Sequence, residues 1–300
     1  MRTIAIINQK GGCGKTTTAI NLSACLARSH RRVLLVDLDP QGHASLGLNL
    51  KPENLLKGMT EVLTQGTCID DVICEAVSPN LDVAPANLTL SSAEQLLGSV
   101  PQKEQRLRSA IQSSRHVYDY VIIDSPPSLG LLTFNALRAS DEAIVPVEMG
   151  FFSLHGLAKL IEIVDVVARH TGHEVIVRAL ATMVNRRVRF SQEILGEVQR
   201  HFMERTFKTV IRNNTRLREA ASHGVPITEY DPGANGAADY TALAQEVVAL
   251  EKNLPVGATA GQTASVLPEN EAEKYLGPIL IEEILTDPSK RAVFKSETSG

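Results

Sequence analysis

Residues 4–17 read IAIINQKGGCGKTT, an apolar run followed by a glycine-rich loop and the start of a helix-forming segment. A strand that leads through such a loop into a helix is the context that phosphate-binding loops require. The glycines let backbone N–H groups approach phosphate oxygens, and the helix N-terminus adds positive potential. In this pattern Lys15 supplies a cation for the phosphates and Thr16 supplies a hydroxyl for Mg²⁺.

The loop departs from the usual phosphate-binding motif at one point. The motif places a glycine before the Gly-Lys pair with four residues between them, and this chain has Gln9 there. The next residue is Lys10, so the loop carries two lysines. The second lysine is the feature that separates this loop from an ordinary one.

The composition indicates a folded α/β protein with an ample core. Of its 300 residues 43% are hydrophobic, and no apolar run is long enough to span a membrane. The chain enters a strand at once, without a basic and apolar leader, so we expect a cytoplasmic protein with reduced cysteines. Aromatic residues make up only 4% and tryptophan is absent, which argues against a base-stacking surface.

Alternating strands and helices predict a mainly parallel, twisted sheet with helices on both faces. Continuously apolar strands such as 120–123 suit a sheet that is buried on both sides. Strands are expected at 3–7, 33–36, 81–84, 120–123, 143–147 and 175–183. Helices are expected at 15–29, 91–98, 104–115, 130–139, 153–170, 190–205 and 236–252. This domain, 1–252, is followed by a low-complexity linker and an acidic tail, 253–300, in which 275–285 could form a short amphipathic helix.

Two further acidic segments follow strands of the predicted sheet. The segment 36–42 (VDLDPQG) places Asp37 and Asp39 two residues apart, on the same side of an extended chain. A carboxylate at this position can hold Mg²⁺ through water or orient a water for attack on a phosphate. The segment 120–127 (YVIIDSPP) ends an apolar strand on Asp124, as in a Walker B strand whose carboxylate reaches the Mg²⁺ shell.

Taken together, the segments 10–18, 37–42 and 123–127 resemble those of the ParA/Soj–MinD family of P-loop ATPases with a deviant Walker A motif. The resemblance covers residues 1 to about 252. It includes 212–220 (RNNTRLREA) and 222–227 (SHGVPI), which are similar to the partitioning ParA branch rather than to MinD.

This resemblance implies roles for individual residues. Two subunits would enclose two ATP molecules, with Lys10 contacting the nucleotide of the partner subunit. Lys10, Lys15 and Asp39 would be the catalytic residues, and Asp39 would position the attacking water. Thr16, Asp37 and Asp124 would serve the Mg²⁺, and Asn185 would contact the adenine. The ATP-binding set is Lys10, Gly11, Gly12, Cys13, Gly14, Lys15, Thr16, Thr17 and Asn185.

A basic segment indicates an anionic partner. Residues 178–218 contain ten Lys/Arg against three Glu, a local balance of +7 in a chain of net charge −4. Doubled by the symmetry of a homodimer, this segment would form a patch for double-stranded DNA, bound without sequence preference on the nucleoid. The candidate DNA-binding residues are Arg187, Arg189, Arg212, Arg216 and Arg218. The alternative is a solvated helix face whose charges pair internally.

The leading hypothesis is therefore an ATPase that moves a chromosome, plasmid or protein cargo with a ParB-like adaptor and without a membrane. A MinD-like, membrane-associated regulator of division is the alternative, but it needs a basic amphipathic helix that the acidic tail does not offer. An ATPase of the nitrogenase iron-protein kind needs paired cysteine ligands, for which Cys68 and Cys74 are poorly placed. A tyrosine-kinase relative would need a terminal tyrosine cluster, and the tail has only Tyr275.

Overall fold

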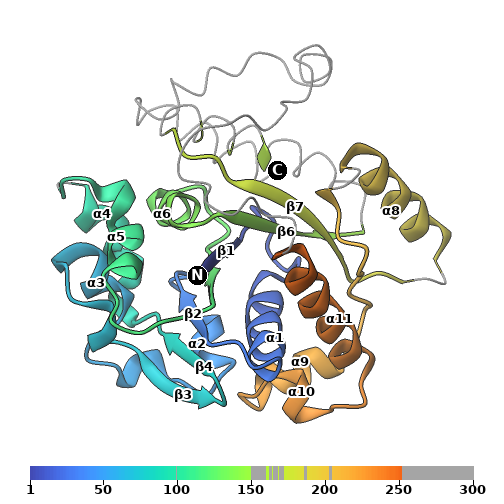
Figure 1. Ribbon diagram of the computed structural model, residues 1–300, viewed down its shortest axis with the longest axis horizontal. Helices are drawn as coiled ribbons and strands as arrows, with labels where there is room; N and C mark the ends of the chain where they lie inside the picture. Colours follow the sequence, from blue (N-terminus) through green and yellow to red (C-terminus); the bar gives the residue numbers. More distant parts are fainter. Residues whose placement is uncertain are drawn as a thin grey trace. The chain divides into compact units, whose positions relative to one another are not determined.

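The computed structural model describes residues 1–98, 100–149, 160, 161, 164, 168, 172–185, 188–202 and 205–251. In this part of the chain, strands and helices alternate around one mainly parallel sheet (Figure 1). Most of the predicted helix 153–170 lies outside the described residues, and so does the whole predicted tail 253–300. Both stay predictions.

The sheet of the described part has seven strands in the order β3-β4-β2-β5-β1-β6-β7. All neighbours are parallel except β3 and β4. The predicted fold class is confirmed, and the six predicted strands are found to within one residue at each end. They are β1 (Arg2–Ile6), β2 (Val33–Asp37), β4 (Leu81–Ala84), β5 (Tyr120–Asp124), β6 (Glu142–Glu148) and β7 (Ile176–Thr182).

The seventh strand, β3 (Cys74–Ser78), was not predicted. Its sequence CEAVS has no apolar run, and none of its residues is fully buried. It lies at the edge of the sheet, pairs antiparallel with β4, and shifts register within its length. An edge strand needs little apolar sequence because only one of its sides is paired and its faces are partly solvated.

Six of the predicted helices are present, and the described helices that were not predicted are all of one or two turns. Helices of one or two turns carry too few residues to show a 3.6-residue period. The predicted helices correspond to α1 (Lys15–Arg28), α4 (Ala93–Leu97), α5 (Arg106–Gln112), α6 (Leu131–Ala139), α8 (Arg189–Phe202) and α11 (Asn235–Leu250). The others are α2 (His43–Leu46), α3 (Met59–Gln65), α9 (Arg216–Ser222), α10 (Ile227–Tyr230) and the 3₁₀ turns η1 (Pro52–Asn54), η2 (Ile69–Asp71), η3 (Leu88–Ser92) and η4 (Lys103–Gln105).

The sheet separates two apolar cores, because successive side chains of a strand point to opposite faces. On one face Leu34 and Val121 pack with residues of α3 to α6. On the other face Leu35 and Ile122 pack with residues of α1, α9 and α11 (Figure 1). Burial on both sides explains why the central strands are apolar throughout.

This topology brings the predicted site segments to one edge of the sheet. Central β1 lies between β5 and β6, and the glycine-rich loop follows its carboxyl end. Asp37 of β2 is in register with Asp124 of β5, which is in register with Ile6 of β1. The loop and both carboxylates therefore meet at the carboxyl ends of adjacent parallel strands, where ligands bind in sheets of this kind.

Candidate nucleotide-binding site

Two positions of the glycine-rich loop have a backbone conformation that favours glycine. Gly12 has φ 74° and Gly14 has φ 95°, both in the left-handed region that other residues rarely adopt. Gly14 is the N-cap of α1, and its carbonyl accepts the first helical hydrogen bond, from the N–H of Thr18. The loop therefore delivers Lys15 and Thr16 to the first turn of α1, with the free N–H groups of that turn beside them.

Lys15 is the first residue of α1, directly after the loop, and is almost fully buried, with 7% exposure. Its ammonium donates a hydrogen bond to the carbonyl oxygen of Lys10 at 3.2 Å. The thiol of Cys13 also lies 3.2 Å from that oxygen, which places it within the turn of the loop. The loop thus curls around a cation, as a phosphate-binding site requires.

Lys10 points away from Lys15 toward the end of β6. Its Nζ lies 2.6 Å from Oε2 of Glu148, and both side chains remain accessible to solvent. The backbone N–H of Lys10 donates to Oδ1 of Asn8, and Nδ2 of Asn8 donates to the carbonyl of Pro146. The first half of the loop is therefore tied to β6.

The second half of the loop is tied to β7. The hydroxyl of Thr182 donates to the carbonyl oxygen of Cys13 at 2.9 Å. Thr182 is in register with Glu148 on the neighbouring strand. Neither Thr182 nor Glu148 was predicted as a site residue from the sequence. Their signal is a polar residue at the carboxyl end of an apolar strand, the same signal that marked Asp37 and Asp124.

Asp124 offers a site for a cation. It is fully buried, and neither of its carboxylate oxygens has a hydrogen-bond partner among the described residues. Burial, together with the charge of Asp37, raises the pKa of Asp124 well above its usual range, while Thr16 and Lys15 oppose that shift. A buried carboxylate with both oxygens available next to a threonine fits the oxygen ligands that Mg²⁺ prefers.

Asp37 is placed differently from Asp124. Its Oδ1 accepts the N–H of Asp39, and its Oδ2 accepts both the N–H and the hydroxyl of Ser45, at 2.8 and 2.7 Å. Burial raises the pKa of Asp37 to about 6, against these hydrogen bonds. Asp37 thus anchors α2 and the turn before it, and its role toward Mg²⁺ stays a prediction.

Asp39 begins the turn that connects β2 to α2. Its side chain is 6% exposed, and its Oδ1 accepts the N–H of Gln41 at 2.9 Å. In the described part of the chain, Oδ2 of Asp39 has no hydrogen-bond partner. A carboxylate fixed by one oxygen, with the other available, could orient a water molecule.

Comparisons with known proteins agree with this geometry. A family model described as an AAA domain matches residues 1–177. The chain is 44% identical over 247 residues to the sporulation initiation inhibitor protein Soj of Bacillus subtilis, covering 82% of this chain and 98% of Soj. It is 40% identical to the chromosome partitioning protein ParA of Myxococcus xanthus, covering 82% of this chain and 88% of that protein. The chain belongs to the ParA/Soj family of P-loop ATPases.

A solved structure of the same fold supports the assignment. The structure of a plasmid partition protein from Borrelia burgdorferi, bound to AMPPNP, has a TM-score of 0.71 and 25% identity. The alignment covers 84% of this chain and 99% of that one. The alignments with these relatives cover 82% to 84% of this chain, and the predicted domain end near residue 252 stays a prediction.

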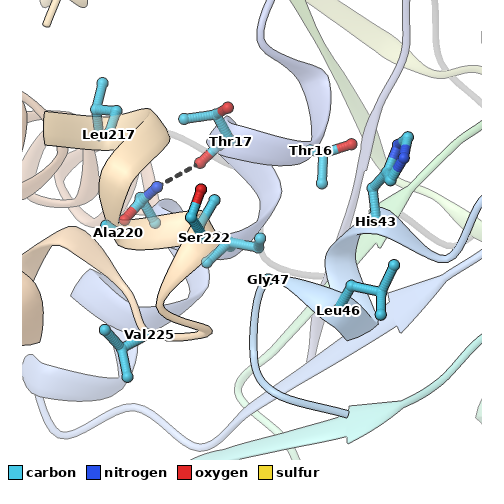
Figure 2. A pocket seen from close by; sticks show the side chains of 12 residues that line it. Thr16, Thr17, His43, Leu46, Gly47, Leu217, Ala220, Ser222 and Val225 are labelled. Atoms are coloured by element: carbon cyan, nitrogen blue, oxygen red, sulfur yellow. Dashed lines mark hydrogen bonds between the residues drawn. The ribbon is translucent and has the colours of Figure 1, made fainter. Parts of the chain in front are cut away.

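In this family member, a pocket of about 350 Å³ lies beside Thr16. Figure 2 shows Thr16 and Thr17 on α1, His43 and Leu46 on α2, and Ser222 at the end of α9. The pocket's walls come from the P-loop helix, from the helix that follows Asp39, and from the helix that carries Arg216 and Arg218. Leu217, from the basic segment, thus lines the same pocket as Thr16 of the candidate site.

The predicted DNA-binding arginines differ in their surroundings. The guanidinium of Arg212 forms a bidentate pair with Asp239, with Nη2 2.6 Å from Oδ1. Arg216 pairs with Glu219 at 2.6 Å and with Asp231 at 3.5 Å. Arg218 is exposed and has no ion pair within the described residues. Arg187 lies outside the described residues, and so does the side chain of Arg189.

Asn185, the predicted adenine contact, follows β7 and is exposed. Its N–H donates to the hydroxyl of Ser191 at 3.3 Å, which ties it to the first turn of α8. Its position is on the β7 side of the loop, close in sequence to Thr182. Its contact with adenine stays a prediction.

Proposed function

We propose that this protein is an ATP-hydrolysing partitioning protein that dimerises when ATP binds and then binds DNA without sequence preference. One observation carries this proposal. A P-loop with two lysines, Lys15 buried at the start of α1 and Lys10 half-exposed, adjoins Asp39 and Asp124 at the same edge of the sheet. The name of the ParA relatives, chromosome partitioning protein, supports partitioning as the cellular role.

The residues of the site have different roles in ATP binding and hydrolysis. Lys15 and the loop N–H groups bind the β- and γ-phosphates, with Gly11, Gly12 and Gly14 allowing the close approach. Thr16 and Asp124 hold Mg²⁺, which neutralises phosphate charge when bound. Asp39 orients the attacking water.

Lys10 makes dimerisation depend on ATP. Its half-exposed side chain stands at the rim of the site and can reach a nucleotide held by a second subunit. The γ-phosphate supplies the anionic target, and hydrolysis removes part of it, so the dimer loosens after turnover.

The DNA-binding face consists of the basic segment of each subunit. Arg218 and Arg216, on α9, are exposed, and two-fold symmetry would place two such helices on one assembly. Contacts of this kind neutralise phosphates without reading bases, so affinity should fall steeply with salt. A ParB-like adaptor would link the nucleoid-bound dimer to its cargo. No helix in the described part of the chain is long and apolar enough to cross a membrane.

The test combines three measurements on the purified full chain. Light scattering after gel filtration should show a monomer alone and a dimer with AMPPNP and Mg²⁺. Fluorescence anisotropy with unrelated DNA duplexes should show binding only under dimer-forming conditions, and the affinity should drop at high salt. ATP turnover should be slow and should rise when DNA and the adaptor are added. Nucleotide-dependent binding to anionic vesicles in place of DNA would contradict the proposal and favour a MinD-like role.

A further inference from the structure

The ion pair between Lys10 and Glu148 joins the second lysine of the loop to a carboxylate of its own subunit. We infer that Glu148 is a positioning residue that holds Lys10 within the subunit and thereby sets how strongly ATP drives dimerisation. This inference rests on the proposed function, in which Lys10 contacts the partner's nucleotide.

The backbones that carry Lys10 and Glu148 are each held in place by other contacts, so the fold itself brings the two side chains together. Glu148 ends β6, whose residues 142–147 are all buried, and it is in register with Thr182 of β7. The N–H of Lys10 is held by Asn8, which in turn is bound to the carbonyl of Pro146 on the same strand. The loop and β6 are therefore docked together directly beside the ion pair.

The pair is close but accessible. The two atoms are 2.6 Å apart, while the side chains of Lys10 and Glu148 are 44% and 37% exposed. A charge-assisted hydrogen bond of this length is favourable, and its exposure keeps it weak enough to exchange for another anion. Among the described residues no other carboxylate forms an ion pair with Lys10.

The same ammonium is needed in two places. To reach a nucleotide on the partner subunit, Lys10 must exchange its contact with Glu148 for one with phosphate oxygens. The exchange opposes dimerisation, and symmetry makes it occur twice in each dimer. Glu148 therefore competes with the partner's nucleotide for the ammonium of Lys10. A nucleotide that offers a weak anionic target loses this competition and supports few dimers, whereas a full triphosphate still supports dimerisation.

The test measures the dimer dissociation constant of the full chain by sedimentation equilibrium with saturating AMPPNP and Mg²⁺. Glu148→Gln should lower this constant about 4- to 25-fold, since an exposed pair contributes a factor of about 2 to 5 and two pairs are lost. The matched control is Glu53→Gln, which removes an exposed carboxylate that has no ion pair in the described part of the chain. Glu148→Asp, which keeps the charge on a shorter side chain, should give an intermediate value.

Two further measurements separate this inference from the proposed function. The gain from Glu148→Gln should shrink at 1 M salt, where exposed charges are screened. The melting temperature should fall by at most about 4 °C, because the lost pair is exposed and weak, while the monomer's ATP affinity stays at the wild-type value. If Glu148→Gln leaves the dissociation constant unchanged or raises it, while Lys10→Ala stays monomeric, the inferred role of Glu148 is overturned and the proposed role of Lys10 stands. A Lys10→Ala variant that dimerises like the wild type would instead overturn the proposed function of Lys10.

Discussion

The ammonium of Lys15 and the carbonyl oxygen of Lys10 are joined by a hydrogen bond of 3.2 Å, which links the two lysines of the loop. The backbone carbonyl of Lys10 thus accepts a hydrogen bond from one ammonium, while the side-chain ammonium of Lys10 donates to Oε2 of Glu148. In the proposed binding mode, phosphates that contact Lys15 would compete with the carbonyl oxygen of Lys10 for its ammonium.

Lys15→Ala should lower ATP affinity by about 100-fold or more, because hydrogen bonds from an ammonium to phosphates are each worth about 1.5–3 kcal/mol. Isothermal titration calorimetry with ATP and Mg²⁺ measures this directly. The matched control is Lys57→Ala, an exposed lysine outside the loop, which should bind ATP like the wild type. Tight ATP binding by Lys15→Ala would remove the P-loop assignment.

Asp39→Ala should slow ATP hydrolysis by about 100-fold, since orientation of a water by a carboxylate contributes factors of this size. Nucleotide binding should persist, so the variant should accumulate as a dimer with ATP itself rather than only with AMPPNP. A phosphate-release assay and light scattering check the two parts. Asp71→Ala, an exposed acid in η2, is the control. Wild-type turnover in Asp39→Ala would exclude the proposed role.

The sequence predicted the central sheet well because its strands are buried on both faces. Val121 and Ile122 lie in opposite cores, so an apolar side chain is required at both positions and the strand stands out as a continuous run. β3 lacks this requirement, since its residues are partly exposed at the edge of the sheet. The strand was missed for that physical reason.

The site was predicted where the chemistry is local and missed where it depends on register. The P-loop is a contiguous motif, so Lys15 and Thr16 could be recognised directly. Ser45 binds Asp37 from eight residues away, and Glu148 meets Lys10 from 138 residues away. Only the pairing of β6 with β1 brings Glu148 to the loop. Charge counting likewise could not reveal that Asp239 holds Arg212.

The surroundings of the arginines predict that Arg216 and Arg218 act in DNA binding, whereas Arg212 acts mainly in folding. Arg218→Ala should weaken DNA binding several-fold and reduce its salt dependence, with unchanged stability, because this side chain is exposed and has no ion pair within the described residues. Arg216→Glu should weaken DNA binding while ATP-driven dimerisation persists. Anisotropy with a DNA duplex at two salt concentrations measures both. Unchanged, salt-sensitive affinity in both variants would show that α9 is a solvated surface.

Arg212→Ala should act mainly on folding. It would leave the carboxylate of Asp239, which is 10% exposed, without its bidentate partner, at a cost of about 1–3 kcal/mol in the free energy of unfolding. Urea denaturation followed by circular dichroism measures this loss. Arg218→Ala serves as the matched control on the same basic segment. Loss of DNA binding without any loss of stability would show that Arg212 contacts DNA itself.

Asp70 should make the free energy of unfolding depend on pH. Burial acts to raise its pKa, but hydrogen bonds from the Ser114 hydroxyl and from the N–H and side chain of Arg115 outweigh it, and the pKa falls to about 2 from its usual 3.8. In the unfolded chain the carboxyl binds its proton more readily. Its stabilising contribution is therefore complete above about pH 4 and is lost as the pH falls toward 2.

Asp70→Asn should consequently lower the free energy of unfolding by about 1–2 kcal/mol at pH 7, since one pKa unit corresponds to about 1.4 kcal/mol and the partner Arg115 is largely exposed. The difference between wild type and variant should narrow between pH 4 and pH 2. Urea denaturation at several pH values measures it, with Asp71→Asn as the neighbouring control. A difference that stays constant down to pH 2 would mean that the charge of the Asp70 carboxylate has no part in the effect, because Asp70 is the one titrating group that the wild type has and the variant lacks.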